Sequence, residues 1–325
     1  MHAALEALLT EVIDYAGLFP PAELPLETAV RNYADCQTQP EAWMLGRFIC
    51  PASRLDELIP PAASLFARQR PLRVSVTLGG VNDLDAFVNR CNEAREAIAH
   101  FREAAGEAGT VEMGEIQLAP ALVEDDTVFA RWRELVGGER GCAALPENMM
   151  LFYEIPLTGQ WRRSAGRLVD WIAARDTVAR TPMRGAAGFK LRCGGPAASA
   201  VPSTRQVAWI IQRCREGEVP LKFAGGLRHP MRHYDTGART FAHGFLNVFI
   251  AGVLSHALAL DEGDICGILD EIDLRQFRFT DEAVGWADAE ADIAEILVAR
   301  RSRIISLESS SFDEPREHLT DAGLM

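Results

Sequence analysis

The stretch GFKLRCGG, residues 188–195, and the stretch PLKFAGGLRHP, residues 220–230, decide the fold class. Each is a short apolar run that ends in a pair of glycines. Between them lies a segment with helical spacing, PSTRQVAWIIQRCREGE, residues 202–218. Apolar strands that alternate with helices are typical of a parallel sheet, because the helices cover its faces. These residues therefore predict a strand–helix–strand unit.

The same alternation continues through most of the chain and predicts eight such units between residues 10 and 260. Eight units indicate the α/β class and a closed (β/α)8 TIM barrel. The alternative is an open doubly wound sheet, but no GxGxxG follows the first expected strand, so the fingerprint of dinucleotide binding is missing. The expected strands are residues 11–19, 43–51, 72–80, 111–123, 149–157, 186–195, 219–227 and, running on into a helix, 243–260.

The residues after the expected barrel differ in character. Residues 261–303 predict a small helical appendix, and residues 304–325 predict a tail without a clear period. The tail has two interpretations: a strap on the surface, or a segment whose Asp313, Glu314 or Arg316 folds back over a site. The expected domains are therefore a barrel of residues 1–260 and a C-terminal helical extension with its tail, residues 261–325.

The composition limits the class of protein. The 325 residues are 48% hydrophobic, and a net charge of −13 argues against nonspecific binding to nucleic acid or to an anionic membrane. No run approaches the roughly 20 apolar residues of a membrane span, and residues 1–19 lack the basic start of a signal peptide. Seven scattered cysteines without a CxxC favour reduced thiols in a cytoplasmic protein and disfavour a cysteine zinc site.

Polar side chains stand near the carboxyl ends of the expected strands, which is where active residues lie in this kind of barrel. Because side chains alternate along a strand, Lys190 and Arg192 point to one face. The set of polar and glycine positions at the strand ends is Asp14, Tyr15, Glu115, Gln117, Glu154, Lys190, Arg192, Lys222, Gly225, Gly226, Arg228, His229, His243 and Asn247.

Lys190 and Lys222 lie in the middle of adjacent expected strands, where burying an ammonium is costly. A neighbouring cation and an apolar wall both disfavour the ammonium form, so one lysine can be the free amine that attacks a carbonyl and forms a Schiff base. The alternative is structural: each lysine pairs with a carboxylate, such as Glu154 or Asp14, and fills the barrel.

The residues that follow these lysines suit a negatively charged ligand. Arg192, Arg228 and His229 can hold a carboxylate or a phosphate. Gly225 and Gly226 let the backbone approach a ligand closely, although a tight turn explains them equally well. His229, with His233 and His243, also offers nitrogens for a metal, but the spacing fits no common zinc signature, and loop or hydrogen-bonding histidines are the simpler interpretation.

Seven motifs, in order, resemble those of the deoxyribose-phosphate aldolase family of class I aldolases. The resemblance runs from about residue 12 to residue 232, and each motif follows one expected strand. The motifs are VIDYAGLFPPAELPLETAV, RFICPASRLDEL, VSVTLGG, GEIQL, FYEIPLT, GFKLRCGG and LKFAGGLRHP. The sixth corresponds to the family's Schiff-base lysine and the seventh to its second lysine.

The resemblance implies that Lys190 forms the Schiff base and that Lys222 lowers its affinity for a proton. It implies that Asp14 and Glu154 are further polar groups of the catalytic site. Gln117 departs from the family, which has an aspartate there that takes part in proton transfer, and an amide cannot act as a general acid or base. Glu154, Tyr15 or a bound water would have to carry the proton instead.

The sequence thus predicts a Schiff-base lyase of the aldolase type that acts on a small, anionic carbonyl compound without a cofactor or metal. Arg192 and Arg228 would hold the anionic end, with Tyr15, Gln117, the two glycines, His229, His243 and Asn247 lining the site. Two alternatives stay open: a metal-dependent lyase or isomerase that uses the histidines with Glu154, and a metabolite-binding protein without activity. The expected partner is a small molecule, with no nucleic acid or membrane, and association into a homo-oligomer is common for such barrels.

Overall fold

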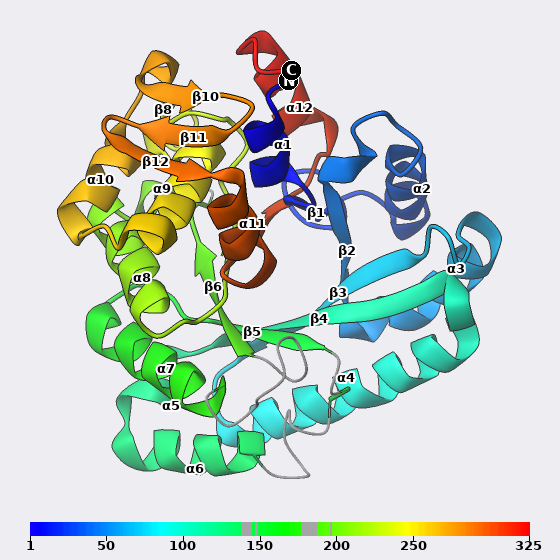
Figure 1. Ribbon diagram of the computed structural model, residues 1–325. Coiled ribbons are helices and arrows are strands. Elements are labelled where there is room, and N and C mark those ends of the chain that lie inside the picture. Colours follow the sequence, from blue (N-terminus) through cyan, green and yellow to red (C-terminus); the bar gives the residue numbers. More distant parts are fainter. Residues whose placement is uncertain (138–144, 147–148, 177–186, 196) are drawn as a thin grey trace. The chain divides into compact units, whose positions relative to one another are not determined.

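The computed structural model describes residues 1–137, 145–146, 149–176, 187–195 and 197–325 (Figure 1). Eight strands form a closed barrel in the order β1-β13-β7-β6-β5-β4-β3-β2, which confirms the predicted (β/α)8 fold class. The strands of the barrel are β1 (Ile13–Tyr15), β2 (Leu45–Pro51), β3 (Leu72–Val81), β4 (Gly109–Leu118), β5 (Met150–Glu154), β6 (Ala187–Arg192), β7 (Leu221–Ala224) and β13 (Ile304–Ser309).

The chain divides into two compact units, one of residues Asp14–Lys190 and one of residues Met1–Ile13 with Leu191–Met325. In the first unit, β2 to β6 pair in parallel, each with the next along the chain. The long helix α4 packs along β3 and β4 (Figure 1). The helices of this unit are α2 (Leu26–Cys36), α3 (Ile59–Leu65), α4 (Leu84–Ala105), α5 (Pro120–Glu124), α6 (Asp126–Gly137) and α7 (Trp161–Asp176).

The second unit contains β7 and β13 as a parallel pair, with two small antiparallel sheets. One is the hairpin β8 (His233–Asp235) and β9 (Thr240–Ala242), and the other has the order β10-β11-β12, with β12 packing on α9. The remaining elements are α1 (Ala3–Leu9), α8 (Thr204–Glu216), α9 (Phe245–Leu258), α10 (Glu262–Asp270), β10 (Phe277–Phe279), β11 (Ala283–Trp286), β12 (Ala289–Asp292), α11 (Ile293–Ser302) and α12 (Asp313–Asp321).

Local capping signals fix where several helices begin. Ser203 and Gln206 form a reciprocal capping box at the start of α8, and Asp292 and Glu295 form another at the start of α11. Each box satisfies backbone N–H groups that have no partner inside the helix, which is worth about 1 kcal/mol per cap. The helix after the sixth strand therefore starts where the Pro-Ser-Thr sequence places it.

The expected eighth strand is wrong. Residues 245–258 form the helix α9, in which residues 245–255 are all buried, and the eighth barrel strand is β13. A continuous apolar run fits a buried strand and a buried helix equally well, which is why the pattern misled. The stretch expected as an appendix and tail thus supplies a strand of the barrel, and Leu307 on β13 pairs with Phe223 on β7.

The cysteines also depart from expectation. Cys36, Cys50, Cys193, Cys214 and Cys266 are free, as expected for reduced thiols. Cys91, which is buried on α4, is disulfide-bonded. The expectation that all the thiols are reduced is therefore wrong at Cys91.

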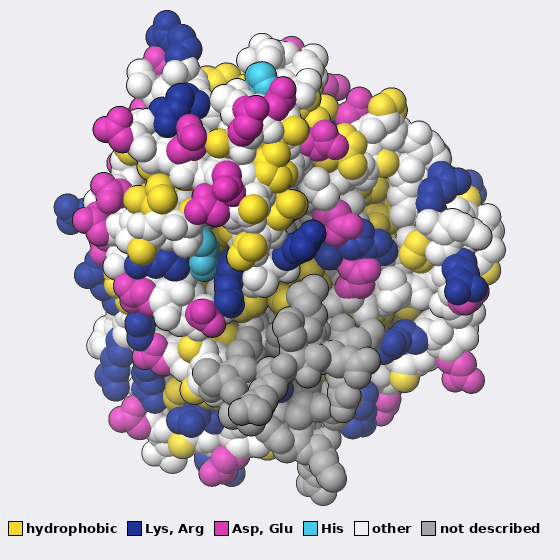
Figure 2. All heavy atoms as spheres, in the orientation of Figure 1, with side chains coloured by type: hydrophobic (Ala, Val, Ile, Leu, Met, Phe, Trp, Pro, Cys, Tyr) yellow, Lys and Arg dark blue, Asp and Glu magenta, His cyan; other side chains and the backbone are white. Residues whose placement is uncertain are grey.

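The surface mixes charges of both signs. On the face shown in Figure 2, acidic and basic side chains are interspersed with small apolar areas, so the basic residues there do not form one continuous surface. Among the described residues, no helix combines the length and the apolar character needed to cross a membrane.

Candidate active site

Lys190 lies between two buried carboxylates in the unit formed by residues Asp14–Lys190. Its side chain is 7% exposed, and its Nζ lies 2.5 Å from Glu115 Oε2 and 3.5 Å from Glu154 Oε2. The strand register explains this arrangement, because Glu154 on β5 pairs with Lys190 on β6, and Gln117 on β4 pairs with Glu154. Glu115 precedes Gln117 by two residues and therefore points to the same face of the sheet.

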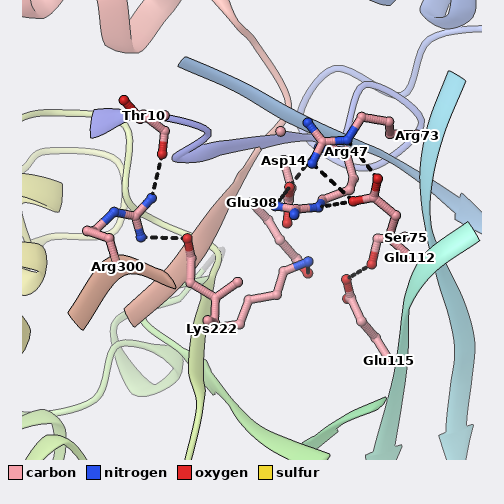
Figure 3. A network of polar contacts seen from close by, with 12 residues as sticks. Thr10, Asp14, Arg47, Arg73, Ser75, Glu112, Glu115, Lys222, Arg300 and Glu308 are labelled. Atoms are coloured by element: carbon pink, nitrogen blue, oxygen red, sulfur yellow. Dashed lines mark hydrogen bonds and ion pairs between the residues drawn. The ribbon is translucent and has the colours of Figure 1, made fainter. Parts of the chain in front are cut away.

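Two uncharged side chains orient the carboxylates. Ser75 Oγ on β3 donates to Glu115 Oε1 at 2.5 Å, as Figure 3 shows, and Gln117 Nε2 donates to Glu154 Oε1 at 3.2 Å. We call Ser75, Glu115, Gln117, Glu154 and Lys190 the Lys190 cluster. Hydrogen bonds and ion pairs connect all five side chains, which come from the neighbouring strands β3, β4, β5 and β6. Each reactive side chain is therefore held by another member.

The Lys190 cluster contains two carboxylates for one ammonium. Opposite charges at these distances favour the charged form of the lysine, whereas burial in an apolar interior disfavours any net charge. A proton can therefore pass along the 2.5 Å contact from Nζ to Glu115 without moving a heavy atom. The arrangement can store a proton, release a free amine and take the proton back.

The sequence did not single out Glu115 for a role, although it lies closer to Lys190 than Glu154 does. The family's aspartate was sought at Gln117, but the nearest carboxylate on β4 stands two residues earlier. The signal was present, since Glu115 alternates with Gln117 along the strand and therefore shares its face. Its buried position, 2% exposed, indicates that it faces the interior with a partner.

Asp14 belongs to a second group of charges in the same unit. Its Oδ1 accepts a hydrogen bond from the backbone N–H of Arg47 at 2.8 Å, and the guanidinium of Arg47 lies 3.8 Å away. Glu112 then lies between Arg47 and Arg73, with Nε–Oε distances of 2.9 and 2.8 Å (Figure 3). The signs alternate along this group, so it is neutral as a set, and it ties β1 through β4 together.

Tyr15 packs into an aromatic group. Its ring lies 6.4 Å from the ring of Tyr33 and 6.1 Å from that of Phe48, and Asn32 Nδ2 donates to its hydroxyl at 3.5 Å. The ring also folds over Gly17, where a Cβ would lie 2.5 Å from the hydroxyl oxygen. These contacts account for the burial of Tyr15, whose predicted role toward a substrate stays a prediction.

Lys222 lies in the other unit, fully buried on β7. Its Nζ lies 3.7 Å from Glu308 Oε1 on the neighbouring strand β13. Glu308 was not among the predicted site residues, because residues 304–325 have no clear period and were expected to form a tail. The alternation of apolar and polar residues in IISLES, residues 304–309, was the available signal.

Lys190 and Lys222 are the only lysines in the chain, although the sequence contains 33 lysine and arginine residues in all. Every other basic side chain that is permanently charged is an arginine. Arginine serves as well as lysine, or better, for surface charge and ion pairs, but it does not act as an amine nucleophile. The two lysines therefore supply a primary amine, which an arginine at the same position would not supply.

The Gly-Gly turn after β7 is explained by backbone packing. Gly225 and Gly226 have φ values of +67° and +75°, and a Cβ on Gly226 would lie 2.8 Å from the Cα of Gly194. Cys193 N–H donates to Ala224 O at 2.7 Å, which holds the ends of β6 and β7 together at this point. Glycine is required here whether or not a ligand approaches.

The two predicted anion-binding arginines differ in setting. Arg192 is exposed at the end of β6, with its guanidinium near Gly225. Arg228 lies 3.7 Å from Glu314 of the C-terminal helix α12. This contact agrees with the second interpretation of the tail, in which Glu314 folds back over a predicted site residue.

His243 and Asn247 hold backbone groups in place. His243 is buried, with Nε2 2.8 Å from Pro202 O, and burial lowers its pKa. Asn247 Oδ1 accepts from Arg232 N–H, and its Nδ2 donates to two carbonyls of the segment that ends α10, at 2.8 Å each. Both side chains thus have a structural use independent of any substrate.

His229 lies between two other imidazoles. Its ring centroid is 4.0 Å from that of His233 and 4.0 Å from that of His318 on α12. Burial first, and then His233, His318 and Arg228, lower the pKa of His229 to about 4. Across the described ranges, no three histidine, cysteine, aspartate or glutamate side chains are grouped so that they could hold a metal ion.

Comparison with known proteins adds no relative to this picture. The chain matches no protein-family model, no curated protein and no solved structure. The similarity to the aldolase family therefore rests on the seven motifs and their order.

Proposed function

We propose that this chain is a lyase of the class I aldolase type in which Lys190 forms a Schiff base with a small carbonyl compound. The observation that carries the proposal is the position of Lys190 Nζ between two buried carboxylates, Glu115 and Glu154. A lysine in this setting has a proton acceptor at hydrogen-bond distance and a second carboxylate beside it. The presence of lysine at positions 190 and 222 alone supports the same conclusion, since Schiff-base chemistry requires a primary amine.

The first half of the reaction forms the imine. Lys190 gives one proton to Glu115, and the free amine attacks the carbonyl carbon to form a carbinolamine. Glu115 returns its proton to the carbinolamine hydroxyl, which leaves as water, and the nitrogen keeps a proton as the iminium. General acid–base help of this kind is worth about 10²–10⁴ in rate.

The second half breaks and remakes bonds beside the iminium. Glu154 accepts the proton of the substrate hydroxyl β to the iminium carbon, the C–C bond breaks, and its electron pair enters the enamine. An aldehyde leaves, Glu154 returns the proton to the enamine carbon, and one water hydrolyses the imine. Atoms and protons balance, because the water released in the first half is consumed at the end.

Glu115 takes the place of the family's strand-four aspartate in this scheme. Gln117 orients Glu154 by a hydrogen bond, which an amide can do although it cannot exchange a proton. Ser75 orients Glu115 in the same way. Arg192, Arg228 and Lys222 belong to the other unit, and their roles toward the substrate stay predictions from the sequence.

Reductive trapping tests the proposal. The protein is incubated with borohydride and a panel of aldehydes, ketones and oxoacids, and the adduct is located by peptide mass spectrometry. Only Lys190, Lys222 and the amino terminus can react, so the assignment is unambiguous. We expect an adduct on Lys190 in the wild-type protein and no adduct at position 190 in Lys190→Arg. In Glu115→Gln, the rate of adduct formation should fall by at least about 100-fold.

The matched control is Lys222→Arg, which keeps the positive charge beside Glu308 and should leave Lys190 able to react. An adduct found on Lys222 but not on Lys190 would contradict the assignment. Absence of any lysine adduct across the whole panel would refute the Schiff-base route.

A further inference from the structure

The C-terminal helix α12 meets the loop after β7 through a set of titratable side chains that take no part in the proton transfers of the proposed reaction. His229 and Arg228 belong to this loop, His233 begins β8, and His318 and Glu314 come from α12. His229 and His318 rings are stacked, with an angle of 19° between their planes. The predicted substrate-binding residues Arg228 and His229 are thus the residues that α12 contacts.

The hydrogen bonds fix how the outer imidazoles are protonated. His318 Nδ1 lies 3.1 Å from Arg228 O, and His233 Nδ1 lies 3.1 Å from Met231 O. A carbonyl oxygen only accepts, so each Nδ1 carries the proton and donates it. Both bonds persist when the ring is neutral, and the helix contact therefore does not require a charge on His318.

A second proton on His229 would act against the contact. It would place a positive charge in a partly buried position, near Arg228 and between two rings whose centroids lie 4.0 Å away. The opposing carboxylates are few: Glu314 on α12 faces Arg228, and Asp235 on β8 faces His229 while accepting two backbone N–H groups of its own turn. Of the other nearby charges, Asp313 pairs with Arg316 and Asp270 with Arg232.

The rest of α12 is anchored by apolar contacts that do not titrate. Leu319 and Phe312 are buried, and Pro315 is buried in the first turn. The imidazole stack with the Arg228–Glu314 pair is thus the part of the helix contact that responds to pH.

We propose that α12 is an acid-sensitive latch, which the neutral imidazole stack holds on the loop after β7 and which protonation of His229 releases, so that Arg228 and His229 lose their contacts with Glu314 and His318. Its regulatory meaning rests on the proposed function, in which Arg228 binds substrate, but its test does not, because hydrogen exchange of α12 involves neither lysine. The latch gives a regulatory use to the C-terminal tail, for which the sequence allowed either a strap on the surface or a segment folded over a site.

The direction and window follow from the lowered pKa of His229. The pKa of His229 is lowered to about 4, so docking is supported above about pH 6.5 and weakens as the pH falls toward 4. Burial is the largest cause of the shift, and His233 and Arg228, which stay beside His229 when α12 leaves, account for another part of it. Because His229 is only partly buried and only part of the shift depends on α12, we expect docking to weaken by about tenfold.

Hydrogen exchange measured by mass spectrometry tests the latch on the full chain. The observable is the protection of the α12 amides at pH 7.5 and 4.5, corrected for the intrinsic pH dependence of exchange. We expect protection of α12 to fall at least tenfold at pH 4.5, while α8 keeps its protection. In His229→Asn and in His318→Asn, whose amides can still donate a hydrogen bond, the change should shrink to less than twofold.

His100→Asn is the matched control, because His100 is an exposed histidine on α4 that pairs with Asp56. It should leave the pH response of α12 unchanged. Equal protection of α12 at both pH values in the wild-type chain would overturn the latch, and so would a full response retained in both variants. Loss of protection in α8 together with α12 would also overturn it, since that pattern is global unfolding.

Discussion

Removing the ammonium of Lys190 should destabilise the protein more than any surface substitution would. In Lys190→Met, the carboxylates of Glu115 and Glu154 stay buried but lose a charge 2.5 and 3.5 Å away. At an effective dielectric constant of about 20, those attractions amount to about 7 and about 5 kcal/mol, and much of each offsets the cost of burying the ions. The net loss expected for a broken buried pair is about 3–5 kcal/mol.

Denaturant and thermal unfolding measure this loss. The entropy of unfolding scales with chain length, so 1 kcal/mol corresponds to about 1.5 °C for a protein of 325 residues, and Tm should fall by about 4–7 °C. Adding Glu115→Gln to Lys190→Met should recover part of the loss, because an amide needs no counter-ion and Ser75 can still donate to its oxygen. Lowering the pH should reduce the stability loss of Lys190→Met, because a protonated carboxyl group also needs no counter-ion.

The exposed Arg54–Glu57 pair supplies the control, since Arg54→Met should cost less than about 1 kcal/mol. A loss below about 1 kcal/mol for Lys190→Met would refute the reasoning. The reasoning would also be refuted if the double variant Lys190→Met/Glu115→Gln were less stable than Lys190→Met alone. That result would mean that another group stabilises the charge of Glu115.

Three further predictions concern the framework, and chemical denaturation at stated pH checks each. Gly226→Ala should cost at least about 2 kcal/mol of stability, because its Cβ would meet the Gly194 backbone at 2.8 Å. Gly79→Ala, also at positive φ but in open space, should cost about 1 kcal/mol. Equal costs for the two variants would contradict the packing argument. Arg300→Met should cost about 2–4 kcal/mol, because the buried guanidinium donates to backbone carbonyls of β13 and of the segment before β1 (Figure 3), and a cost near zero would mean that those carbonyls find other donors. Burial lowers the pKa of His256 to about 4, so the wild-type chain should lose stability as the pH falls from about 6.5 to 4, and His256→Gln should lose about 2–3 kcal/mol less over that range.

The sequence was sufficient for the fold class because seven strands lie between helices with clear apolar periodicity. It failed at α9, where an apolar run without polar interruptions has no period that separates a helix from a strand. It failed again at β13, a six-residue strand far from its expected place in chain order. Topology, rather than local pattern, decides which apolar run closes the barrel.

The site was predictable in its residues more than in its contacts. Lys190 and Glu154 stood out as charges in apolar strands, and the structure brings them to 3.5 Å. The shorter contact, with Glu115, depends on the register between β4, β5 and β6, which no local motif encodes. His318 likewise meets His229 only because α12 folds back across ninety residues of sequence.

The scarcity of lysine has a practical consequence for chemical labelling. Both ε-amines are buried, with whole-residue exposures of 5% for Lys190 and 0% for Lys222. Lys222 is therefore out of reach of an acylating reagent in the folded protein, whereas Lys190 keeps a small exposed fraction. The rate at which Lys222 becomes acylated would report how often the strands around it open, and amine footprinting can therefore measure local opening of the barrel interior.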